Sequence, residues 1–255
     1  MKNGAKHNGR SALILGAAST VARAIAHEFA GAGYALVLAD CDEEETARVA
    51  ADIRVRFCVP CHSLAFDATA FDTHKHIFER CQELLGGLPG GLVLCFGYMT
   101  EQARAQADST LAQRTIDTNF TGAVSILELF AQAFEKHQSG FIAVLSSVAG
   151  DRGRQANYIY GASKGGLTVY LQGLRNRLHA AKVQVTTVKP GFMDTKMTYG
   201  MNLPARLTAS PQCAARAVFK AIMKGKDEVY VPCMWRYIML IIKCIPEFQF
   251  KKMNI

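Results

Sequence analysis

Short runs that are apolar throughout alternate along this chain with longer segments of helical spacing, and this alternation constrains the fold more than any other feature. The first run is Ser11–Leu15, and helical spacing follows over Val21–Ala32. Strands that are apolar at every position have both faces buried, as in a parallel sheet covered by helices. The pattern therefore predicts the α/β class, with a doubly wound parallel sheet in a three-layer α/β/α arrangement.

The alternation runs through the 255 residues without a repeat or a linker, which predicts a single domain. We assign residues 1–232 to this domain and treat residues 233–255 as an apolar and basic tail of the same domain. Ligands bind such sheets at the carboxyl ends of the strands, so the chemistry should lie in the loops there. Further strands are expected at Ala35–Ala39, within Val55–Phe66, and at Gly91–Phe96, Phe141–Ser146, Val183–Val188 and Glu228–Val231, and further helices at Glu43–Arg54, Phe71–Leu85, Asp108–Lys136, Tyr160–Ala180 and Pro211–Met223.

Composition limits the partners and the compartment. The 29 Lys and Arg against 21 Asp and Glu give a formal charge of +8, which favours anionic partners such as a phosphorylated substrate or an acidic membrane surface. No patch of interleaved aromatic and basic residues is visible, so we expect no nucleic-acid partner. The eight cysteines lack disulfide spacing, Met1–His7 is polar, and no run approaches the roughly 20 apolar residues of a membrane span. These features predict a cytoplasmic protein.

The turn after the first predicted strand has the character of a phosphate-binding turn. Small side chains let backbone N–H groups and the positive end of the next helix approach a phosphate. The turn has only one glycine, so a plain strand–helix connection is the alternative. The residues predicted to line a dinucleotide here are Gly16, Ala18, Ser19, Thr20 and Val21.

Two acidic residues follow the next two strands at positions suited to the adenosine end of a dinucleotide. Asp40 comes 24 residues after Gly16, where an acid accepts hydrogen bonds from ribose hydroxyls and repels a 2′-phosphate. We therefore expect NAD, as NADH, in preference to NADP. Asp67 follows the third strand and is predicted to bond the adenine amino group. For both residues the alternative is to cap the next helix.

A tyrosine, a lysine and a serine have the spacing of an acid–base site. Tyr160 and Lys164 lie four residues apart on a predicted helix and hence on one face of it, thirteen residues after Ser147. A free tyrosine has a pKa of about 10, and a neighbouring ammonium lowers it toward neutrality. Ser147 can hold a carbonyl or hydroxyl beside the phenol, and Asn119 can organise a water that relays protons. We predict these four residues as the catalytic set.

Over its whole length the chain resembles the short-chain dehydrogenase/reductase family. The resemblance rests on Asn119, on Ser147 with Tyr160 and Lys164, and on Pro190–Thr195 after the sixth strand. It implies a Rossmann-like fold and hydride transfer between a nicotinamide and a carbonyl or alcohol. Tyr160 would be the acid–base, and Lys164 would serve both the tyrosine and the nicotinamide ribose. It also implies a homodimer or homotetramer. The further cofactor contacts implied are Ala68, Phe96, Gly97, Pro190, Gly191 and Thr195.

Where the chain departs from the usual family motifs, it resembles one branch, the decaprenylphosphoryl-2-keto-β-D-erythro-pentose reductases. The glycine turn has lost two glycines, and Leu94–Gly97 replaces the usual Asn-Asn-Ala-Gly. The branch motifs are Phe96–Gln102, Gly150–Tyr160 and the tail. This similarity implies reduction of a 2-keto-sugar on a polyprenyl phosphate, a cell-envelope precursor, together with an oxidase partner. Two alternatives are a reductase of a soluble ketone, steroid-like or β-ketoacyl substrate, and a non-catalytic NAD-binding regulator or scaffold.

The tail and two arginines leave further alternatives open. Trp235–Ile242 is aromatic and apolar and is flanked by Arg236, Lys243, Lys251 and Lys252, so it suits peripheral contact with the inner face of a membrane. A wall of the substrate pocket or a subunit interface suits it as well. Arg152 and Arg154 can meet a substrate phosphate or be ordinary surface residues.

We expect no metal site. Cys58–His62 spells a haem-attachment pattern but lies in the third-strand region, where cysteines serve as small apolar side chains.

Overall fold

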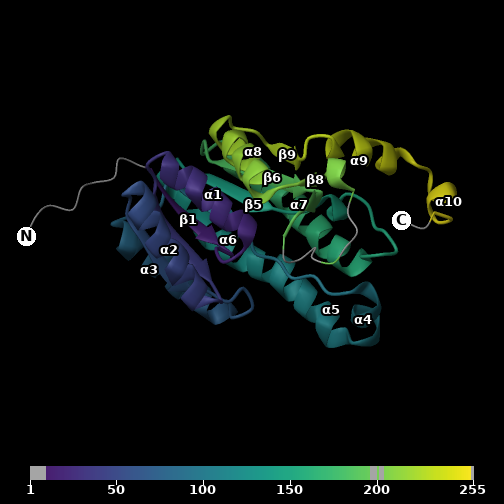
Figure 1. The fold of residues 1–255 in the computed structure, drawn as a ribbon, viewed down its shortest axis with the longest axis horizontal. Helices are drawn as coiled ribbons and strands as arrows, with labels where there is room; N and C mark the ends of the chain where they lie inside the picture. The colour runs from purple at the N-terminus through teal and green to yellow at the C-terminus, as the bar shows by residue number, and fades with distance from the viewer. Residues whose placement is uncertain (1–9, 196–199, 201–203, 254–255) are drawn as a thin grey trace, which may run out of the picture.

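A seven-stranded, entirely parallel sheet forms the centre of the protein in a computed structural model, which describes residues 10–195, 200 and 204–253. The polar N-terminal segment Met1–His7 lies outside the described residues. The strand order is β3-β2-β1-β4-β5-β6-β9, which is the doubly wound arrangement expected from the sequence (Figure 1). The strands are β1 Ser11–Leu15, β2 Ala35–Asp40, β3 Cys61–Ala65, β4 Gly91–Leu94, β5 Phe141–Leu145, β6 Gln184–Pro190 and β9 Glu228–Val231.

The inner strands are buried on both faces, which explains why β1 and β4 are apolar at almost every position, whereas the edge strand β3 has half-buried and exposed positions as well. Along β1, Ala12 and Ile14 belong to one hydrophobic core, and Leu13 and Leu15 belong to the core on the other face. One face is covered by α1 (Thr20–Gly31), α2 (Glu43–Phe57) and α8 (Pro211–Met223), and the other by α3 (His74–Leu85), α6 (Gly122–His137) and α7 (Tyr158–Leu178). The predicted single three-layer α/β domain is confirmed.

Local sequence signals set where several helices begin. Ser19 precedes α1, and its hydroxyl accepts a hydrogen bond from the N–H of Ala22. Asp42 caps α2 in the same way, and three glutamates, Glu43–Glu45, occupy the first turn, where the helix dipole favours negative charge. Ser210 caps α8, with Pro211 at its first position. Residues outside the apolar pattern therefore determine the helix boundaries.

The predicted helix Asp108–Lys136 is interrupted in the structure. It consists of α5 (Ser109–Ile116), a wide π-helical turn over Asp117–Thr121, and α6. The turn brings Asn119 inward, and Gly122 follows it against the loop after β3, where a Cβ atom would lie 2.0 Å from the carbonyl oxygen of Ala68. The wide turn therefore places the side chain of Asn119 beside the loop that follows β4.

Several short elements were not expected from the sequence. These are α4 (Gln102–Ala107), the small parallel pair β7 (Phe192–Met193) and β8 (Thr208–Ala209), α9 (Trp235–Cys244) and α10 (Glu247–Phe250). The tail is thus helical, and it packs through Trp235 and Met239 against Val148 and Tyr230 of the domain.

Candidate active site

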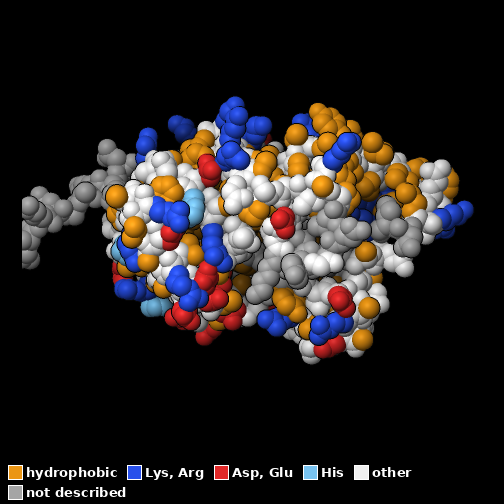
Figure 2. Space-filling model, in the orientation of Figure 1, with side chains coloured by type: hydrophobic (Ala, Val, Ile, Leu, Met, Phe, Trp, Pro, Cys, Tyr) orange, Lys and Arg blue, Asp and Glu red, His pale blue; other side chains and the backbone are white. Residues whose placement is uncertain are grey.

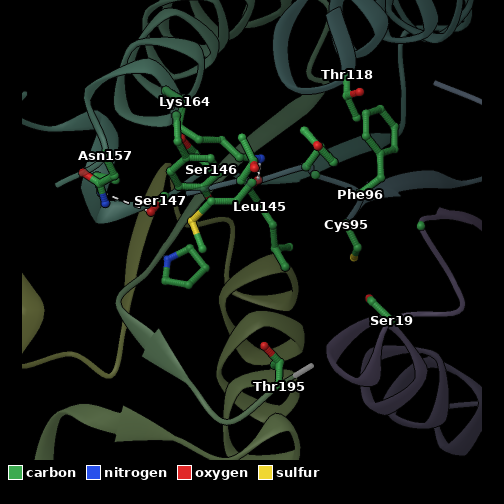
Figure 3. A pocket seen from close by; sticks show the side chains of 18 of the residues that line it. Ser19, Cys95, Phe96, Thr118, Leu145, Ser146, Ser147, Asn157, Lys164 and Thr195 are labelled. Carbon is green, nitrogen blue, oxygen red and sulfur yellow. Dashed lines mark hydrogen bonds between the residues drawn. The ribbon is translucent and has the colours of Figure 1, made fainter. Parts of the chain in front are cut away.

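A cavity of about 1240 Å³ opens at the carboxyl ends of β1, β4, β5 and β6. It lies where a doubly wound sheet is expected to bind its ligand. Figure 3 shows its walls, with Ser19 at one end and Asn157 at the other. The cavity brings together most of the predicted site residues: Gly16, Ser19, Asp40, Asp67, Ala68, Phe96, Gly97, Ser147, Tyr160, Lys164, Pro190, Gly191 and Thr195.

The turn after β1 requires its single glycine. Gly16 has a φ of +79°, and a Cβ atom there would lie 2.5 Å from the backbone nitrogen of Phe96. The N–H of Gly16 donates to the carbonyl of Ala39 at 2.8 Å, so the turn is anchored to β2. Three of the predicted cofactor residues do not line the cavity: Val21 is buried in the core, Thr20 is exposed, and Ala18 faces Asp40.

Asp40 ties this turn to the end of β2 and does not cap α2. Its Oδ2 accepts a hydrogen bond from the N–H of Ala18 at 3.0 Å, and its Oδ1 accepts one from the N–H of Asp42 at 3.2 Å. The N-cap is Asp42, so the capping alternative for Asp40 is wrong. The thiol of Cys41 also donates to Oδ1, at 3.4 Å. A carboxylate has about four acceptor positions, so Asp40 retains capacity for one further donor such as a ribose hydroxyl.

Asp67 closes a turn after β3. Its Oδ1 accepts hydrogen bonds from the N–H and the hydroxyl of Thr69 at 2.8 and 2.7 Å, and these bonds lower the pKa of the carboxyl group. Thr73 stands at the N-cap of α3, so Asp67 does not cap that helix. The carboxylate is part of the cavity wall.

The sequence analysis did not identify Arg23, a cation on α1 that lies beside the turn after β1. Arg23 donates to the carbonyl of Ala18 at 3.1 Å and pairs with Glu45 at 2.6 Å. The pairing with Glu45 compensates its charge locally. No spacing rule relates Arg23 to the turn after β2, so only the fold reveals it.

The side chain of Asn119 acts as a brace. It is 1% exposed; its Oδ1 accepts from the N–H of Tyr98 at 2.7 Å, and its Nδ2 donates to the carbonyl of Tyr98 at 2.8 Å and to the hydroxyl of Ser163 at 3.0 Å. These bonds join the loop after β4 to α7. They leave the amide little capacity for the relayed water that the sequence predicts.

Lys164 is a buried cation with one fixed partner. It is 2% exposed, and its Nζ donates to the carbonyl of Leu145 at the end of β5 at 3.0 Å. Burial lowers the pKa of this ammonium group from 10.5 to about 8. An ammonium group has three donors, so two remain for ligands in the cavity.

Tyr160 lies one helical turn before Lys164 and faces the same cavity. Burial raises the pKa of its phenol, and a hydrogen bond with Ser147 opposes that rise. Burial therefore favours the protonated phenol, the form that donates a proton. A lowering of this pKa by the ammonium group of Lys164 stays a prediction from their spacing.

Arg152 fastens the tail and does not face the cavity. Its Nη1 donates to the carbonyls of Ile242, Lys243 and Ile245 at 2.9, 3.1 and 2.6 Å, all at the C-terminal end of α9, where helix carbonyls lack further N–H partners within the helix. Its Nη2 pairs with Glu247 at 2.9 Å, and its guanidinium lies 3.8 Å from the ring centroid of Phe250. The assignment of Arg152 to a substrate phosphate is therefore wrong, and so is the alternative of an ordinary surface arginine.

The first turn of α9 lies directly behind one wall of the cavity. Trp235 packs edge-on against Phe192, a lining residue, with ring centroids 5.1 Å apart. Its Nε1 donates to the carbonyl of Leu207 at 3.0 Å, and a Cβ atom on Gly191 would lie 1.9 Å from that nitrogen. The tail thus supports the pocket wall on one side.

The outward side of α9 is apolar. Met234, Tyr237, Leu240 and Ile241 are exposed there, and Phe248 is exposed on α10. Figure 2 shows hydrophobic side chains gathered over α9, with Lys and Arg side chains beside them. No helix among residues 10–195, 200 and 204–253 is long and apolar enough to cross a membrane.

The Cys58–His62 pattern has a structural explanation. Cys58 ends α2 in the left-handed conformation, whereas Cys61 starts β3 and is buried, which raises the pKa of its thiol to about 12. In the part of the chain that the structure describes, no three His, Cys, Asp or Glu side chains gather as metal ligands.

Comparisons with known proteins agree with this geometry. The family model described as "short chain dehydrogenase" matches residues 10–204. An uncharacterized oxidoreductase of Mycobacterium tuberculosis is 34% identical over 94% of this chain and 96% of that protein, and one of Streptomyces coelicolor is 32% identical over 96% of both. A solved short-chain dehydrogenase from Sphingobium yanoikuyae in complex with NADPH has a similar fold, with a TM-score of 0.80 and 22% identity over 93% of this chain and 96% of that one.

Proposed function

The chain belongs to the short-chain dehydrogenase family and is an oxidoreductase, and from that premise we propose that it is an NADH-dependent reductase of a 2-keto-sugar carried on a polyprenyl phosphate. The observation that carries the proposal is the convergence of Ser147, Tyr160 and Lys164 on the same cavity as the turn at Gly16. An acid–base group beside a dinucleotide turn is what hydride transfer to a carbonyl requires.

The residues at the adenosine end fit a dinucleotide with a free ribose 2′-hydroxyl. Gly16 leaves room for a close backbone approach, and the N-terminus of α1 offers a positive end to a pyrophosphate. Asp40 retains acceptor capacity and would repel a 2′-phosphate, so we favour NAD over NADP. Arg23, the cation near this end, is paired with Glu45.

At the catalytic end each residue has a distinct role. NADH supplies the hydride to the carbonyl carbon when it is bound. Tyr160 donates the phenolic proton to the carbonyl oxygen, so that the ketone becomes an alcohol. Ser147 holds that oxygen by a hydrogen bond, and Lys164 orients the ribose with its two remaining donors. Asn119 keeps the loop after β4 in register with α7.

The lipid-linked substrate is supported by the tail. Its outward face is apolar and is flanked by Arg236, Lys243, Lys251 and Lys252, a combination that binds anionic lipid surfaces. Because α9 also lies behind the cavity wall, a substrate held in a bilayer would reach the cavity close to the membrane. We propose peripheral attachment at the inner face of the membrane, and an oxidase partner that supplies the keto group.

We also propose a homodimer or homotetramer, built through the helices that carry Asn119 and Tyr160. On α7, Val169 is an apolar side chain that is 67% exposed, as suits a subunit contact. Light scattering measures the oligomeric state. If the protein is a monomer at micromolar concentration, this part of the proposal is contradicted.

The test is NADH oxidation with a polyprenylphosphoryl 2-keto-pentose. Tyr160→Phe removes the proton donor and should reduce turnover by about 10²-fold or more, with NADH binding retained. Tyr158→Phe, two residues earlier on an exposed position of the same helix, is the matched control and should keep full turnover. Equal turnover in the wild type and Tyr160→Phe would refute the catalytic assignment.

Two other outcomes point to the alternative functions. Turnover of soluble ketones or β-ketoacyl thioesters, with none of the lipid-linked sugar, would establish a reductase of soluble substrates. NADH binding without turnover of any carbonyl would favour a regulator or scaffold. For the membrane contact, Leu240→Ser/Ile241→Ser should abolish cosedimentation with vesicles containing anionic lipid. Val55→Ser, at an exposed apolar position of α2 outside the proposed subunit contact, should not affect it.

A further inference from the structure

Three buried polar atoms in the wall of the cavity lack a hydrogen-bond partner within the protein. They are Nε2 of Gln102, Nε of Arg154 and Oδ1 of Asn157, two donors and one acceptor. Buried polar atoms in folded proteins are almost always hydrogen-bonded, and an unsatisfied one carries a desolvation penalty. Among the buried side-chain atoms of the described residues these are the only unsatisfied ones, and all three belong to one cavity.

Local hydrogen bonds connect the three residues at the N-terminal end of α7, the helix that carries Tyr160. The N–H of Asn157 donates to the carbonyl of Arg154 at 3.1 Å, and Oε1 of Gln102 accepts from the N–H of Ile159 at 3.1 Å. Asn157 stands at the N-cap of α7, where an asparagine usually caps the helix, yet its side chain makes no capping bond. Its oxygen is therefore free for a ligand that carries a hydroxyl donor.

Arg154 is a partly buried cation without an ion pair among the described residues. The acidic residue that raises its pKa is Asp151, but the carboxylate of Asp151 is already bonded to Nζ of Lys189 at 2.8 Å and to the hydroxyl of Tyr230 at 2.6 Å. Burial lowers the pKa of Arg154 from a value far above neutrality. Such a cation is best compensated by an anionic ligand.

We propose that Arg154, Gln102 and Asn157 form a recognition site for a phosphate-bearing, hydroxylated part of the substrate. Arg154 and Gln102 donate to the phosphate oxygens, and Asn157 accepts from a hydroxyl. This site deepens the proposed function, on which it rests for the identity of the cavity as a substrate pocket. The phosphate is not one of the cofactor's, because Asn157 and Ser19 lie at opposite ends of the cavity with Ser147 and Lys164 between them (Figure 3).

Calorimetric titration in saturating NAD⁺ tests the site without turnover. The probes are ribose 5-phosphate, inorganic phosphate and ribose, which separate the phosphate from the hydroxyls. Arg154→Gln should weaken ribose 5-phosphate binding by about 10- to 100-fold, the effect of losing a charge-assisted hydrogen bond. Asn157→Ala should weaken ribose 5-phosphate and leave inorganic phosphate unchanged. Arg216→Gln, an exposed arginine on α8, is the charge-matched control and should bind as the wild type does.

The outcomes separate this site from the proposed function. Equal affinity of the wild type and Arg154→Gln for ribose 5-phosphate, or no binding by the wild type, overturns the site even if a keto-sugar is reduced. Loss of binding in Arg154→Gln with no carbonyl reduced by the wild type supports the site and overturns the reductase assignment. If ribose binds as tightly as ribose 5-phosphate, the phosphate plays no part and the proposal fails. NAD⁺ affinity, measured alongside, shows whether each variant has kept its fold.

Discussion

Replacing Arg152 by glutamine should detach the C-terminal helices while leaving the domain folded. The guanidinium holds three carbonyls at the end of α9, the carboxylate of Glu247 and the ring of Phe250. These partners lie 90 or more residues further along the chain, so no local interaction replaces Arg152. The side chain of glutamine is shorter and uncharged and cannot span them.

The magnitude follows from the bonds that are lost. Hydrogen bonds to a charged group contribute about 1.5–3 kcal/mol each. The two N–H groups of Nη1 serve three carbonyls, so losing them costs about 3–6 kcal/mol. Glu247 is exposed, and its ion pair adds less than about 1 kcal/mol. A loss of 3 kcal/mol raises the open population of α9 about 100-fold.

Trp235 makes this change easy to measure, because it is the chain's one tryptophan and is 4% exposed. In Arg152→Gln its fluorescence should shift to longer wavelength, and hydrogen exchange should accelerate about 100-fold over Trp235–Cys244, with β1 and β5 unchanged. Arg236→Gln, on an exposed position of α9, is the control. Unchanged exchange in α9 would refute the anchoring role, and faster exchange everywhere would show that Arg152 supports the whole domain.

Three further predictions concern the cofactor end, the core and the buried lysine. Asp40→Ala should improve NADPH binding relative to NADH by at least about tenfold in a fluorescence titration, since it removes a charge that repels a 2′-phosphate; an unchanged ratio would contradict the NAD preference. Gly122→Ala should destabilise the protein by about 1–3 kcal/mol in urea, because a Cβ atom would lie 2.0 Å from the carbonyl of Ala68, whereas Gly173→Ala on α7, with no atom within 4 Å, should be neutral or stabilising. The pKa of Lys164 is 10.5 in the unfolded chain and about 8 in the folded protein, so the unfolded chain binds more protons between pH 8 and pH 10.5. The free energy of unfolding should therefore rise with pH in that range, by about 3 kcal/mol relative to Lys164→Met. If the wild type and Lys164→Met showed the same pH dependence in urea unfolding, the burial of a charged lysine would be contradicted.

The sheet could be predicted because a strand that is buried on both faces is apolar at consecutive positions, and this pattern is visible within the sequence of the strand itself. Leu13 and Ile14 point to opposite cores, so an uninterrupted apolar run has one explanation in a chain that also contains amphipathic helices. That Ser147, Tyr160 and Lys164 would line one cavity was predictable for a similar reason. Tyr160 and Lys164 lie on one helix, and Ser147 lies at the end of the neighbouring strand, so their relation is local once the fold is known.

Contacts between distant segments could not be predicted. The sequence around Arg152 contains no sign that its partners lie in the tail. Arg154, two residues later, has the same side chain but lines the cavity instead. Burial also raises the pKa of Tyr160, and that burial could not be predicted from the spacing of Tyr160 and Lys164. Short elements such as β7 and β8 are stabilised by packing and carry no periodic pattern.

The wide turn at Asp117–Thr121 makes the length of this segment as important as its composition. A π-helical turn holds one residue more than an α-helical turn, and each residue of an α-helix advances the chain by about 100° around the axis. Deleting a single residue here would restore a continuous helix from α5 to α6, but it would rotate one half against the other. Asn119 would then turn away from Tyr98 and Ser163, although every contacting side chain were still present. Insertions and deletions at this point should therefore be tolerated far less than substitutions on the outer face of the same helices.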